Sequence, residues 1–455
     1  MEDQKLSEKE FQKRIERINK NDPCFFYDLN RCLRCGRCAI KCQQIQGLCP
    51  TQFDENSKKW LVLPTISHAR NREYCSYCGQ CLMVCPTGAI DDKKQIELIK
   101  KEIADPSKIV VVQTAPSIRV SIGETQGMPP GTLLTGRLVA ALKRLGFAKV
   151  FDTNFGADLT TIEESTELLE RMEKNKNLPL ISSCCPAWIR YMERFFYDLR
   201  SYVSSCKSPH QMLGSVIKTY WAKKFGVEPK NIIVVSIMPC TAKKFEAIRE
   251  EHKINGVKTV DFVLTTRELG LMLKEAKIEL RTLPDEFYDS PLGWSTGSAS
   301  LYGVSGGVSE SVLRYVAYQK GQKDKKLEFE EVRRMEGVRQ VSLELGDLQL
   351  NLLIIYGLKN AKAILEKIRN KALENIHFIE IMACPLGCIG GGGQPKPPNL
   401  EIIKKRAMGL YYQDGLLQAR YPQENEEIKK LYEEFLGFPG SSKAKEILHT
   451  SYVKR

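Results

Sequence analysis

Short apolar runs alternate with segments of helical periodicity through most of the chain after residue 108. Apolar runs of roughly four to eight residues predict strands that are buried on both faces. Their alternation with helical segments predicts βαβ units and parallel sheets. The predicted strands are 109–112, 150–152, 180–182, 232–237, 262–264, 352–356 and 378–382. The pattern therefore predicts an α/β fold.

Polar or cysteine-containing motifs follow four of these strands directly. They are Gln-Thr-Ala-Pro-Ser at 113–117, Ser-Ser-Cys-Cys-Pro at 182–186, Met-Pro-Cys at 238–240 and Ala-Cys-Pro-Leu-Gly-Cys at 383–388. Open α/β sheets bind their ligands at the carboxyl ends of the strands. We therefore expect one cleft between two α/β lobes, with the four motifs around it.

Four consecutive glycines, 390–393, follow the last of these motifs. Such a run indicates a backbone that packs closely against a bulky neighbour. No Gly-Lys-Ser/Thr follows it, so the run does not match a phosphate-binding P-loop. The alternative is a flexible glycine turn beside two buried thiols, Cys384 and Cys388.

Two further cysteine runs lie nearer the N-terminus, each spaced Cys-x-x-Cys-x-x-Cys-x-x-x-Cys, at 32–42 and at 75–85. In bacterial ferredoxins three thiolates of such a run hold one 4Fe–4S cluster and the fourth reaches the neighbouring cluster. The spacing assigns one cluster to Cys32, Cys35, Cys38 and Cys85, and the other to Cys75, Cys78, Cys81 and Cys42. A zinc site is the weaker alternative, because the second run ends in the Cys-Pro of ferredoxins.

The composition is that of a soluble globular protein, with 42% hydrophobic and 27% charged residues among 455. No apolar run is long enough to cross a bilayer, and residues 1–21 lack the apolar centre of a signal peptide. We therefore expect a cytoplasmic protein, in which cysteines are read as metal ligands before disulfides. The net charge is +13. No nucleic-acid recognition motif accompanies it, so an acidic protein partner is the better interpretation.

Composition and pattern divide the chain into four parts. We expect a charged helix at 1–22, a ferredoxin-like domain with two 4Fe–4S clusters at 23–106, a two-lobed α/β domain at 107–399 and a helical segment at 400–455. The boundary near 106 is placed at Asp105-Pro106-Ser107, where the charged segment ends.

The motifs at 182–188, 238–246 and 383–395 together resemble the signature motifs of the iron–iron (FeFe) hydrogenases, and the resemblance runs from about residue 25 to the C-terminus. It implies a monomeric form with a two-cluster ferredoxin-like domain, and an active-site H-cluster. The implied ligands of its 4Fe–4S cubane are Cys185, Cys240, Cys384 and Cys388. Cys388 would bridge the cubane to a two-iron subsite that carries CO, CN and a dithiolate. Dedicated maturation enzymes are implied, because side chains cannot supply those ligands.

The resemblance also implies which side chains surround the two-iron subsite. Lys243 is the implied cation beside a cyanide ligand; on the sequence alone it would be a surface lysine. The full set of implied pocket residues is Ala115, Pro116, Ser117, Ser208, His210, Met238, Lys243 and Met382. The C-terminal Leu448-His449-Thr450-Ser451-Tyr452 resembles the small terminal belt of the family, and we expect no chemistry there.

Cys184 matches the proton-transfer cysteine of the family. Glu164, Glu167 and Arg171 fall on one face of a predicted helix and match the family's proton relay. Ser204 matches the hydroxyl between the two acids. The alternative is an ordinary solvated helix face.

Five positions depart from the usual family residue. They are Cys206 for Ala, His210 for Gln, Tyr302 for Phe, Leu386 for Gly and Ser309 for Met. None removes an implied ligand or relay group, but they leave open the cluster potential, the catalytic bias and the oxygen sensitivity. Cys24 and Cys49 are interpreted as ordinary thiols.

The predicted function is the reversible reaction 2H⁺ + 2e⁻ ⇌ H₂, with electrons exchanged through the two ferredoxin-like clusters. The predicted electron partner is an acidic ferredoxin or flavodoxin, because basic residues crowd the first cysteine run: Arg31, Arg34, Arg37 and Lys41. No nucleic acid or membrane partner is expected. The alternatives are a non-catalytic iron–sulfur assembly factor related to hydrogenases, a hydrogen-sensing or uptake-biased hydrogenase, and a pure electron carrier.

Overall fold

The computed structural model describes residues 16, 19–48, 53–54, 59–60, 75–323, 329–346, 348–396 and 399–455. Within them the strands form two four-stranded sheets and two two-stranded sheets. The helix predicted at 1–22 lies largely outside the described residues, with helical backbone seen at 19–21. Cys49 also lies outside them.

The first large sheet is parallel throughout, in the order β6-β5-β8-β9. Its strands are β5 (Ile109–Thr114), β6 (Lys149–Asp152), β8 (Ile232–Met238) and β9 (Phe262–Thr265). β8 is buried along its whole length, as expected for a strand with helices on both faces. The four predicted strands of this sheet are confirmed, each longer by one or two residues.

The second large sheet is mixed, in the order β10-β11-β12-β7. Its strands are β7 (Leu180–Ile181), β10 (Val338–Leu345), β11 (Leu348–Tyr356) and β12 (Phe378–Met382). β7, β12 and β11 run parallel, as predicted, whereas β10 pairs antiparallel with β11. The pattern of apolar runs misses β10 because its buried and exposed residues alternate, as in an edge strand with one solvated face.

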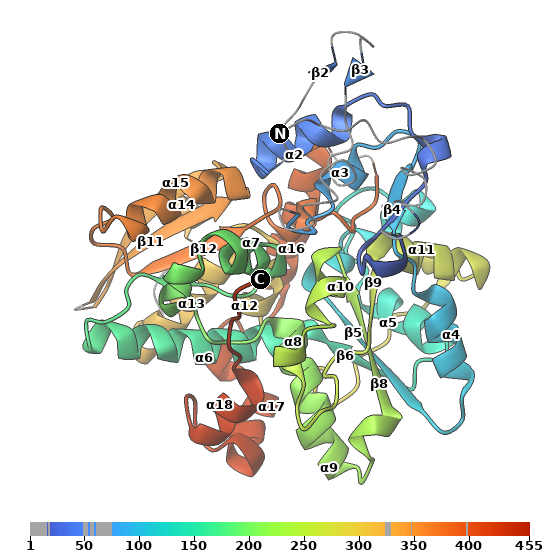
Figure 1. The fold of residues 1–455 in the computed structure, drawn as a ribbon. Helices are drawn as coiled ribbons and strands as arrows, with labels where there is room; N and C mark the ends of the chain where they lie inside the picture. The colour runs from blue at the N-terminus through green and yellow to red at the C-terminus, as the bar shows by residue number, and fades with distance from the viewer. Residues whose placement is uncertain are drawn as a thin grey trace.

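Helices connect the strands and cover both sheets (Figure 1). Those of the first half are α4 (Ile96–Ala104), α5 (Thr135–Arg144), α6 (Thr153–Glu173), α7 (Pro186–Phe195), α8 (Pro209–Val216), α9 (Ala222–Lys224), α10 (Ala242–Glu246) and α11 (Thr266–Glu275). Those that follow are α12 (Gly297–Ser300), α13 (Gly307–Gln319), α14 (Glu330–Arg333) and α15 (Leu358–Arg369). The long helix α6 packs on α8 and on α13, so it lies between the two lobes.

The N-terminal part is built around a two-stranded antiparallel sheet of β1 (Phe25–Tyr27) and β4 (Ile90–Asp92). Each cysteine run continues into a helix, α2 (Arg37–Ile45) or α3 (Gln80–Met83), and β2 (Phe53–Asp54) pairs with β3 (Lys59–Trp60). The residue before each helix is a glycine in the left-handed region, Gly36 with φ 79° and Gly79 with φ 75°. The two runs therefore share one backbone conformation, as their common spacing predicts.

The glycine run packs backbone against backbone. A Cβ atom on Gly391 would lie 2.2 Å from the carbonyl oxygen of Pro239, and one on Gly392 would lie 2.2 Å from that of Cys78. The side-chain amide of Gln80 also donates to the carbonyl of Gly390 at 2.8 Å. The run therefore joins the end of β8 to the second cysteine run. The close packing that the sequence predicts is present, and the partner is protein backbone.

The C-terminal segment is helical, as predicted, with α16 (Leu400–Leu416), α17 (Glu426–Leu431) and α18 (Ser442–Leu448). Leu431, Tyr432 and Leu436 are buried and hold this segment against the rest of the chain. α17 and α18 form the base of the molecule in the view of Figure 1, and α18 packs on α8. Across the described ranges, no helix combines the length and the apolar character needed to cross a membrane.

The close packing of the glycine run predicts that a side chain at position 392 destabilises the fold. Gly392→Ala should lower the midpoint of thermal unfolding, because overpacking against the Cys78 carbonyl typically costs about 1–3 kcal/mol. The matched control is Gly415→Ala in α16, where a Cβ would meet no atom within 4 Å. That variant should be neutral or more stable by up to about 1 kcal/mol. Equal midpoints for Gly392→Ala and the parent protein would contradict the close packing.

Candidate active site

Four cysteines from three strand ends come together where the two large sheets meet. Cys185 caps α7 just after β7, Cys240 follows β8, Cys384 follows β12, and Cys388 begins a short helical turn after Gly387. The charges of Cys240, Cys185 and Cys388 all act on Cys384. The structure therefore brings together all four cysteines that the resemblance implies as cubane ligands.

These thiols lie in a dry environment that suits a metal cluster. Burial raises the pKa of Cys388 to about 12 and raises the pKa of Cys384 well above its usual value. Burial also raises the pKa of Cys185, although backbone N–H groups of Ala383, Trp188 and Ala187 oppose that rise by donating to its sulfur. Buried sulfurs with raised pKa values favour the anionic form only beside a cation. The donor set therefore fits an iron–sulfur cubane.

The implied pocket residues lie at the carboxyl ends of β5, β8 and β12. Ala115 and Pro116 follow β5, Met238 ends β8 and Met382 ends β12, and all four are buried. The hydroxyl of Ser117 is buried and has no hydrogen-bond partner among the residues that the structure describes. An unpaired buried hydroxyl is costly. It therefore fits a pocket that a polar ligand completes.

Lys243 lies at the centre of a buried polar network. Its ammonium group donates to the hydroxyl of Ser208 at 2.8 Å, to Oε2 of Glu246 at 2.7 Å and to the carbonyl of Cys184 at 3.2 Å. Burial opposes the charge on Lys243, but Glu246 outweighs it and the net pKa is raised. The residue is a buried cation of the site and no surface lysine.

Glu246 is a site residue that the sequence analysis left without a role. Burial would raise its pKa, yet the charge of Lys243 and the hydrogen bond from His210 hold the pKa of this carboxyl well below its usual value. One sequence feature could have identified Glu246: it follows Lys243 by three residues on α10, which places both side chains on one helix face.

His210 is buried beside Glu246, with Nε2 2.6 Å from Oε2 of that glutamate and Nδ1 3.3 Å from the hydroxyl of Ser236. Burial and then the charge of Lys243 lower the pKa of His210 to about 4, despite the opposing charge of Glu246. The ring is therefore neutral near pH 7, with Nε2–H donating to Glu246. A glutamine side chain at this position would donate a hydrogen bond in the same way. Because the histidine ring is neutral, it adds no positive charge in place of that glutamine.

The implied relay residues lie in a line that leads outward from Cys184. Burial and the charge of Glu164 raise the pKa of Cys184 well above its usual value. Burial, then the charge of Glu167, raise the pKa of Glu164 to about 8, against hydrogen bonds from Ser183 and Ser204. Oε2 of Glu164 has no hydrogen-bond partner in the described part of the chain. Both groups therefore hold protons near neutral pH.

Ser204 connects Glu164 to the outer acid. Its hydroxyl lies within reach of Glu164 and donates to Oε2 of Glu167 at 2.9 Å. Oε1 of Glu167 accepts from Arg171 at 2.6 Å. Glu167 and Arg171 line a pocket of about 270 Å³ that opens to solvent. The predicted face of α6 therefore connects the buried site with the surface.

The C-terminal belt contributes to this outer pocket, although the sequence predicts no chemistry there. His449 follows α18 and lines the pocket. Its Nε2 lies 2.9 Å from Oε2 of Glu163, and its Nδ1 lies 2.7 Å from the hydroxyl of Ser205. Local sequence patterns carry no sign of this contact, because His449 and Glu163 are far apart in the chain.

The remaining departures from the family pattern have local explanations. Leu386 has φ 55°, a left-handed conformation that glycine adopts without strain. The hydroxyl of Tyr302 pairs with Thr161 at 2.8 Å, and the hydroxyl of Ser309 donates to Glu380 at 3.0 Å. None of the three side chains takes the place of an implied ligand.

The cysteine runs near the N-terminus form two groups. Cys32, Cys85 and Cys35 lie close enough to Cys38 for their charges to act on it. Cys78, Cys75, Cys42 and Cys38 act in the same way on Cys81. Cys38 belongs to the other set that the ferredoxin spacing assigns, so the two sets lie next to each other. Cys384 of the active site lies close enough to Cys78 for their charges to interact, whereas Cys35 is exposed. The groups therefore follow one another from the surface to the active site.

Comparison with protein families matches three parts of the chain. The C-terminal domain of the iron-only hydrogenase large subunit matches residues 108–392, the iron hydrogenase small subunit matches residues 400–455, and a 4Fe-4S binding domain matches residues 69–91. The first of these covers more than half of the chain. The chain therefore contains regions that match both the large and the small subunit of iron hydrogenases.

Relatives and solved structures extend this likeness. NADP-reducing hydrogenase subunit HndD of Solidesulfovibrio fructosivorans is 44% identical over 94% of this chain and 74% of its own. Iron hydrogenase 1 of Clostridium pasteurianum is 38% identical over 97% and 78%, and Protein NAR1 of Arabidopsis thaliana is 33% identical over 83% and 84%. The structure of [FeFe]-hydrogenase HydA1 from Chlamydomonas reinhardtii covers 79% of this chain and 99% of its own, with a TM-score of 0.71 and 39% identity. The chain therefore belongs to the iron–iron (FeFe) hydrogenase family.

Proposed function

We propose that this chain is a catalytic FeFe hydrogenase that carries out 2H⁺ + 2e⁻ ⇌ H₂. The observation that carries the proposal is the succession of acidic and hydroxyl groups that leads from Cys184 to the solvent pocket. It begins beside the four-cysteine site and continues through Glu164, Ser204 and Glu167. An electron carrier or a scaffold for cluster assembly has no use for such a line.

The H-cluster is the group that would supply the redox chemistry when bound. Cys185, Cys240, Cys384 and Cys388 would hold its cubane, and Cys388 would also bridge to the two-iron subsite. Lys243 is the buried cation that would pair with an anionic ligand there, and the unpartnered hydroxyl of Ser117 would donate to another. Ala115, Pro116, Met238 and Met382 exclude water around it. The maturation enzymes implied by the resemblance would install the two-iron subsite.

The protein's own part in proton transfer follows from charge and burial. Cys184 holds its proton because burial makes a thiolate costly there. Glu164, with a pKa of about 8, can both accept and release a proton near neutral pH, which is the range in which general acids and bases act best. Ser204 lies between Glu164 and Glu167, and Arg171 holds Glu167 at the pocket. A proton can therefore pass between the site and solvent in either direction.

Electrons would travel through the two groups of cysteines near the N-terminus, each holding one 4Fe–4S cluster. Cys32, Cys35, Cys38 and Cys85 form the outer group, and Cys42, Cys75, Cys78 and Cys81 form the inner one. The order is supported by the exposure of Cys35 and by the closeness of Cys78 to Cys384. We further propose a cytoplasmic location, as the cysteine content predicts.

The main alternative is a non-catalytic assembly factor. Relatives of that kind are named as cytosolic Fe-S cluster assembly factors and are 31–32% identical to this chain. Such a role requires cubanes without the two-iron subsite. Cys184, Glu164 and the Lys243–Glu246 pair then have no purpose. The higher identity to hydrogenases, up to 44%, also favours catalysis. A hydrogen-sensing or uptake-biased enzyme would use the same residues.

Cys184 tests the proposed function directly. In matured protein, Cys184→Ala should retain the infrared bands of metal-bound CO and CN, because this thiol is no ligand. Its H₂ turnover should fall by at least ~10²–10⁴-fold, the usual contribution of a positioned acid–base group. Cys185→Ala, the neighbouring ligand, is the matched control and should lose the bands as well. Matured wild-type protein without these bands would favour the assembly factor instead.

The raised pKa of Glu164 predicts that the stability of the folded chain depends on pH. The folded chain holds this proton up to about pH 8, whereas an unfolded glutamate releases it near pH ~4.3. The stabilisation is therefore complete below about pH 4 and is lost as the pH rises through about 8. Glu164→Gln should raise the thermal midpoint relative to the parent by more at about pH 9 than at about pH 5. Glu170→Gln, on the same helix with a side chain 45% exposed, should show no such difference.

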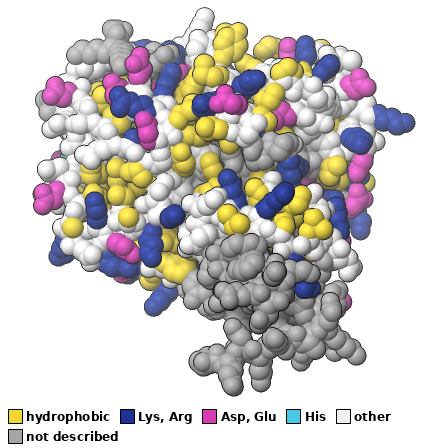
Figure 2. Space-filling view, turned by 90° about the horizontal axis from the view of Figure 1, so that it is seen from above, with side chains coloured by type: hydrophobic (Ala, Val, Ile, Leu, Met, Phe, Trp, Pro, Cys, Tyr) yellow, Lys and Arg dark blue, Asp and Glu magenta, His cyan; other side chains and the backbone are white. Residues whose placement is uncertain are grey.

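The docking face for the electron partner is proposed at the first cysteine run. Arg31, Arg34 and Arg37 are exposed there, and Leu33 is 67% exposed. Figure 2 looks onto the molecule from the N-terminal domain's side and shows Lys and Arg side chains spread over that face among hydrophobic ones. A basic rim around an exposed apolar residue suits an acidic ferredoxin or flavodoxin. The name of the relative HndD makes another subunit of a larger hydrogenase the other candidate.

Charge reversal tests this face. Arg34→Glu should lower the association rate with an acidic ferredoxin by about 10-fold or more at low salt, and the parent rate should fall as salt rises. Lys429→Glu in α17, at the opposite end of the molecule in Figure 1, is the control with the same change of charge. It should leave the rate within about twofold. A parent rate that does not depend on salt would contradict this docking face.

A further inference from the structure

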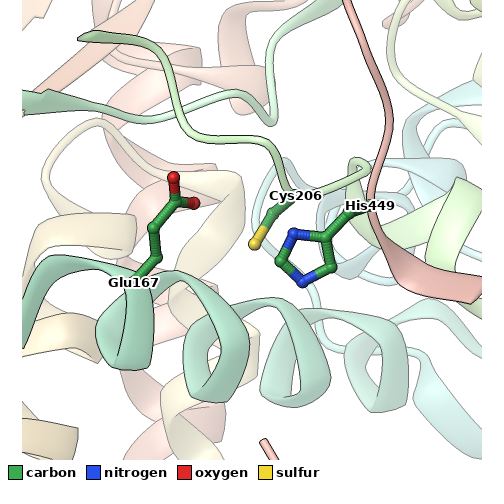
Figure 3. Close-up of side chains that lie close together, drawn as sticks. All are labelled: Glu167, Cys206 and His449. Atoms are coloured by element: carbon green, nitrogen blue, oxygen red, sulfur yellow. The ribbon is translucent and has the colours of Figure 1, made fainter. Parts of the chain in front are cut away.

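A thiol, an imidazole and a carboxylate lie close together at the outer end of the proton path. One ligand atom each from Glu167, Cys206 and His449 lies within 4.8 Å of the other two (Figure 3). Figure 3 shows the three side chains near one another, with Glu167 on α6, Cys206 in the segment that precedes α8 and His449 in the C-terminal belt. Among the described residues, no other three such side chains have their ligand atoms all within 4.8 Å of one another.

Backbone pairing fixes two of the three side chains. Cys206 and His449 are partners in an antiparallel bridge. Hydrogen bonds on both sides of the bridge continue it: Lys207 N donates to Leu448 O at 2.8 Å, and Thr450 N donates to Ser205 O at 2.8 Å. The thiol and the imidazole are therefore held side by side by the main chain. Such preorganisation lowers the cost of forming a metal site.

The orientation of His449 is that of a metal-binding histidine. Its Nε2 lies 2.9 Å from Oε2 of Glu163, and that oxygen also accepts from Gly440 N at 3.0 Å. Oε1 of Glu163 accepts from the hydroxyl of Tyr432 at 2.5 Å. Because Nε2 faces a carboxylate acceptor, it is the ring nitrogen that carries the hydrogen. The lone pair is then on Nδ1, which faces the hydroxyl of Ser205. A carboxylate behind a histidine is the usual support of a histidine ligand.

Two members of the cluster, Glu167 and His449, line a solvent pocket, whereas Cys206 is buried. Glu167, His449 and Ser205 line the solvent pocket of about 270 Å³, together with Glu163 and Glu170. The basic side chains on its walls are Arg171, Lys174, Lys176 and Lys445. Oε1 of Glu167 accepts from Arg171, and Oε2 accepts from the hydroxyl of Ser204 and from Ser205 N. A carboxylate offers about four lone-pair directions, two on each oxygen, so one direction remains on Oε1. The pocket thus provides an entry path and room for a water as fourth ligand.

We propose that Glu167, Cys206 and His449 form a zinc site that closes the proton path when a divalent zinc-type ion binds. Thiolate, imidazole and carboxylate together with one water form the tetrahedral set that Zn²⁺ prefers. Glu167 is the outer acid of the path, and coordination removes the lone pair on which its proton transfer depends. The inhibitory part of this inference rests on the proposed function, whereas the metal site itself does not.

Binding is balanced by the loss of one proton. Burial, then the charges of Glu167, Glu164 and Glu163, raise the pKa of Cys206 well above its usual value, so the sulfur carries a proton without the metal. Zn²⁺ takes the place of that proton, which passes to the solvent, and His449 binds as the neutral ring. Glu167 binds as the carboxylate. No oxidation or reduction is involved.

The experiment measures zinc binding and its geometry on the protein loaded with its iron–sulfur clusters. Equilibrium dialysis with ZnSO₄ should give one tightly held zinc ion per chain, with the iron content unchanged. X-ray absorption at the zinc edge should show one sulfur at about 2.3 Å and nitrogen or oxygen at about 2.0 Å. Cys206→Ala should lose the sulfur, and Cys206→Ala and His449→Ala should each weaken binding by more than about 100-fold, since even partners behind a ligand contribute about 10–100-fold.

Glu170→Gln is the matched control, because it removes a carboxylate from the same pocket and leaves the three ligands in place. It should retain the zinc ion and the sulfur neighbour. Zinc that stays in both Cys206→Ala and His449→Ala, or a zinc shell without sulfur in the parent protein, would overturn the site.

The effect on turnover is measured separately. Stoichiometric zinc should reduce the H₂ turnover of matured enzyme and chelation should restore it. Cys206→Ala and His449→Ala, each compared with its own rate without metal, should resist zinc. Full turnover with the site occupied would overturn the closing of the path while leaving the metal site intact. Zinc bound at the site in a protein without any hydrogenase activity would support the site and refute the proposed function.

Discussion

The contact between the glycine run and two carbonyl groups is the constraint on which the rest of the structure depends. Gly391 lies against the Pro239 carbonyl, and Gly392 lies against that of Cys78. Only a residue without a Cβ allows these approaches. The same short segment therefore locks the end of β8, the cysteines after β12 and the second cysteine run into one body, which keeps the proposed electron path short.

Charge is handled differently on the two sides of the site. On the side of α10, Lys243, Glu246 and His210 satisfy one another in a dry network without net charge, which fixes the Lys243 cation where an anionic ligand would lie. Buried charges are tolerated when they are paired and hydrogen-bonded. On the side of α6, burial keeps protons on Cys184 and Glu164. The Lys243 cation therefore suits an anionic ligand that stays bound. The neutral Cys184 and Glu164 suit a proton that passes along the path.

The outer end of the proton path depends on the C-terminal belt. His449 and Tyr432 hold Glu163 on α6, while Arg171 and Ser204 hold Glu167 one turn further on. α6 therefore carries two carboxylates with separate partners, one tied to the belt and one open to the pocket. Cys206 lies between them, and the backbone bridge to His449 keeps it there.

The sequence by itself determined the strands, the motifs at their ends and the spacing of the cysteine runs, because these are local properties. A run such as 232–237 is apolar enough to be a buried strand wherever it lies, and parallel strands place their ends at one edge. The sequence also predicted one face of α6 for Glu164, Glu167 and Arg171 from helical periodicity alone. It missed β10, because one solvated face breaks the apolar run that the other strands show.

Only the tertiary structure decided the partners of these groups. Periodicity cannot show that His449 lies against Glu163 and beside Cys206, since such contacts join residues more than 240 positions apart. Nor can composition give the state of His210, because burial and Lys243 lower its pKa while Glu246 opposes them, and the balance depends on distances. The residue types of each motif can be identified from short stretches of sequence. The electrostatic environment of each group is set by which stretches fold against one another.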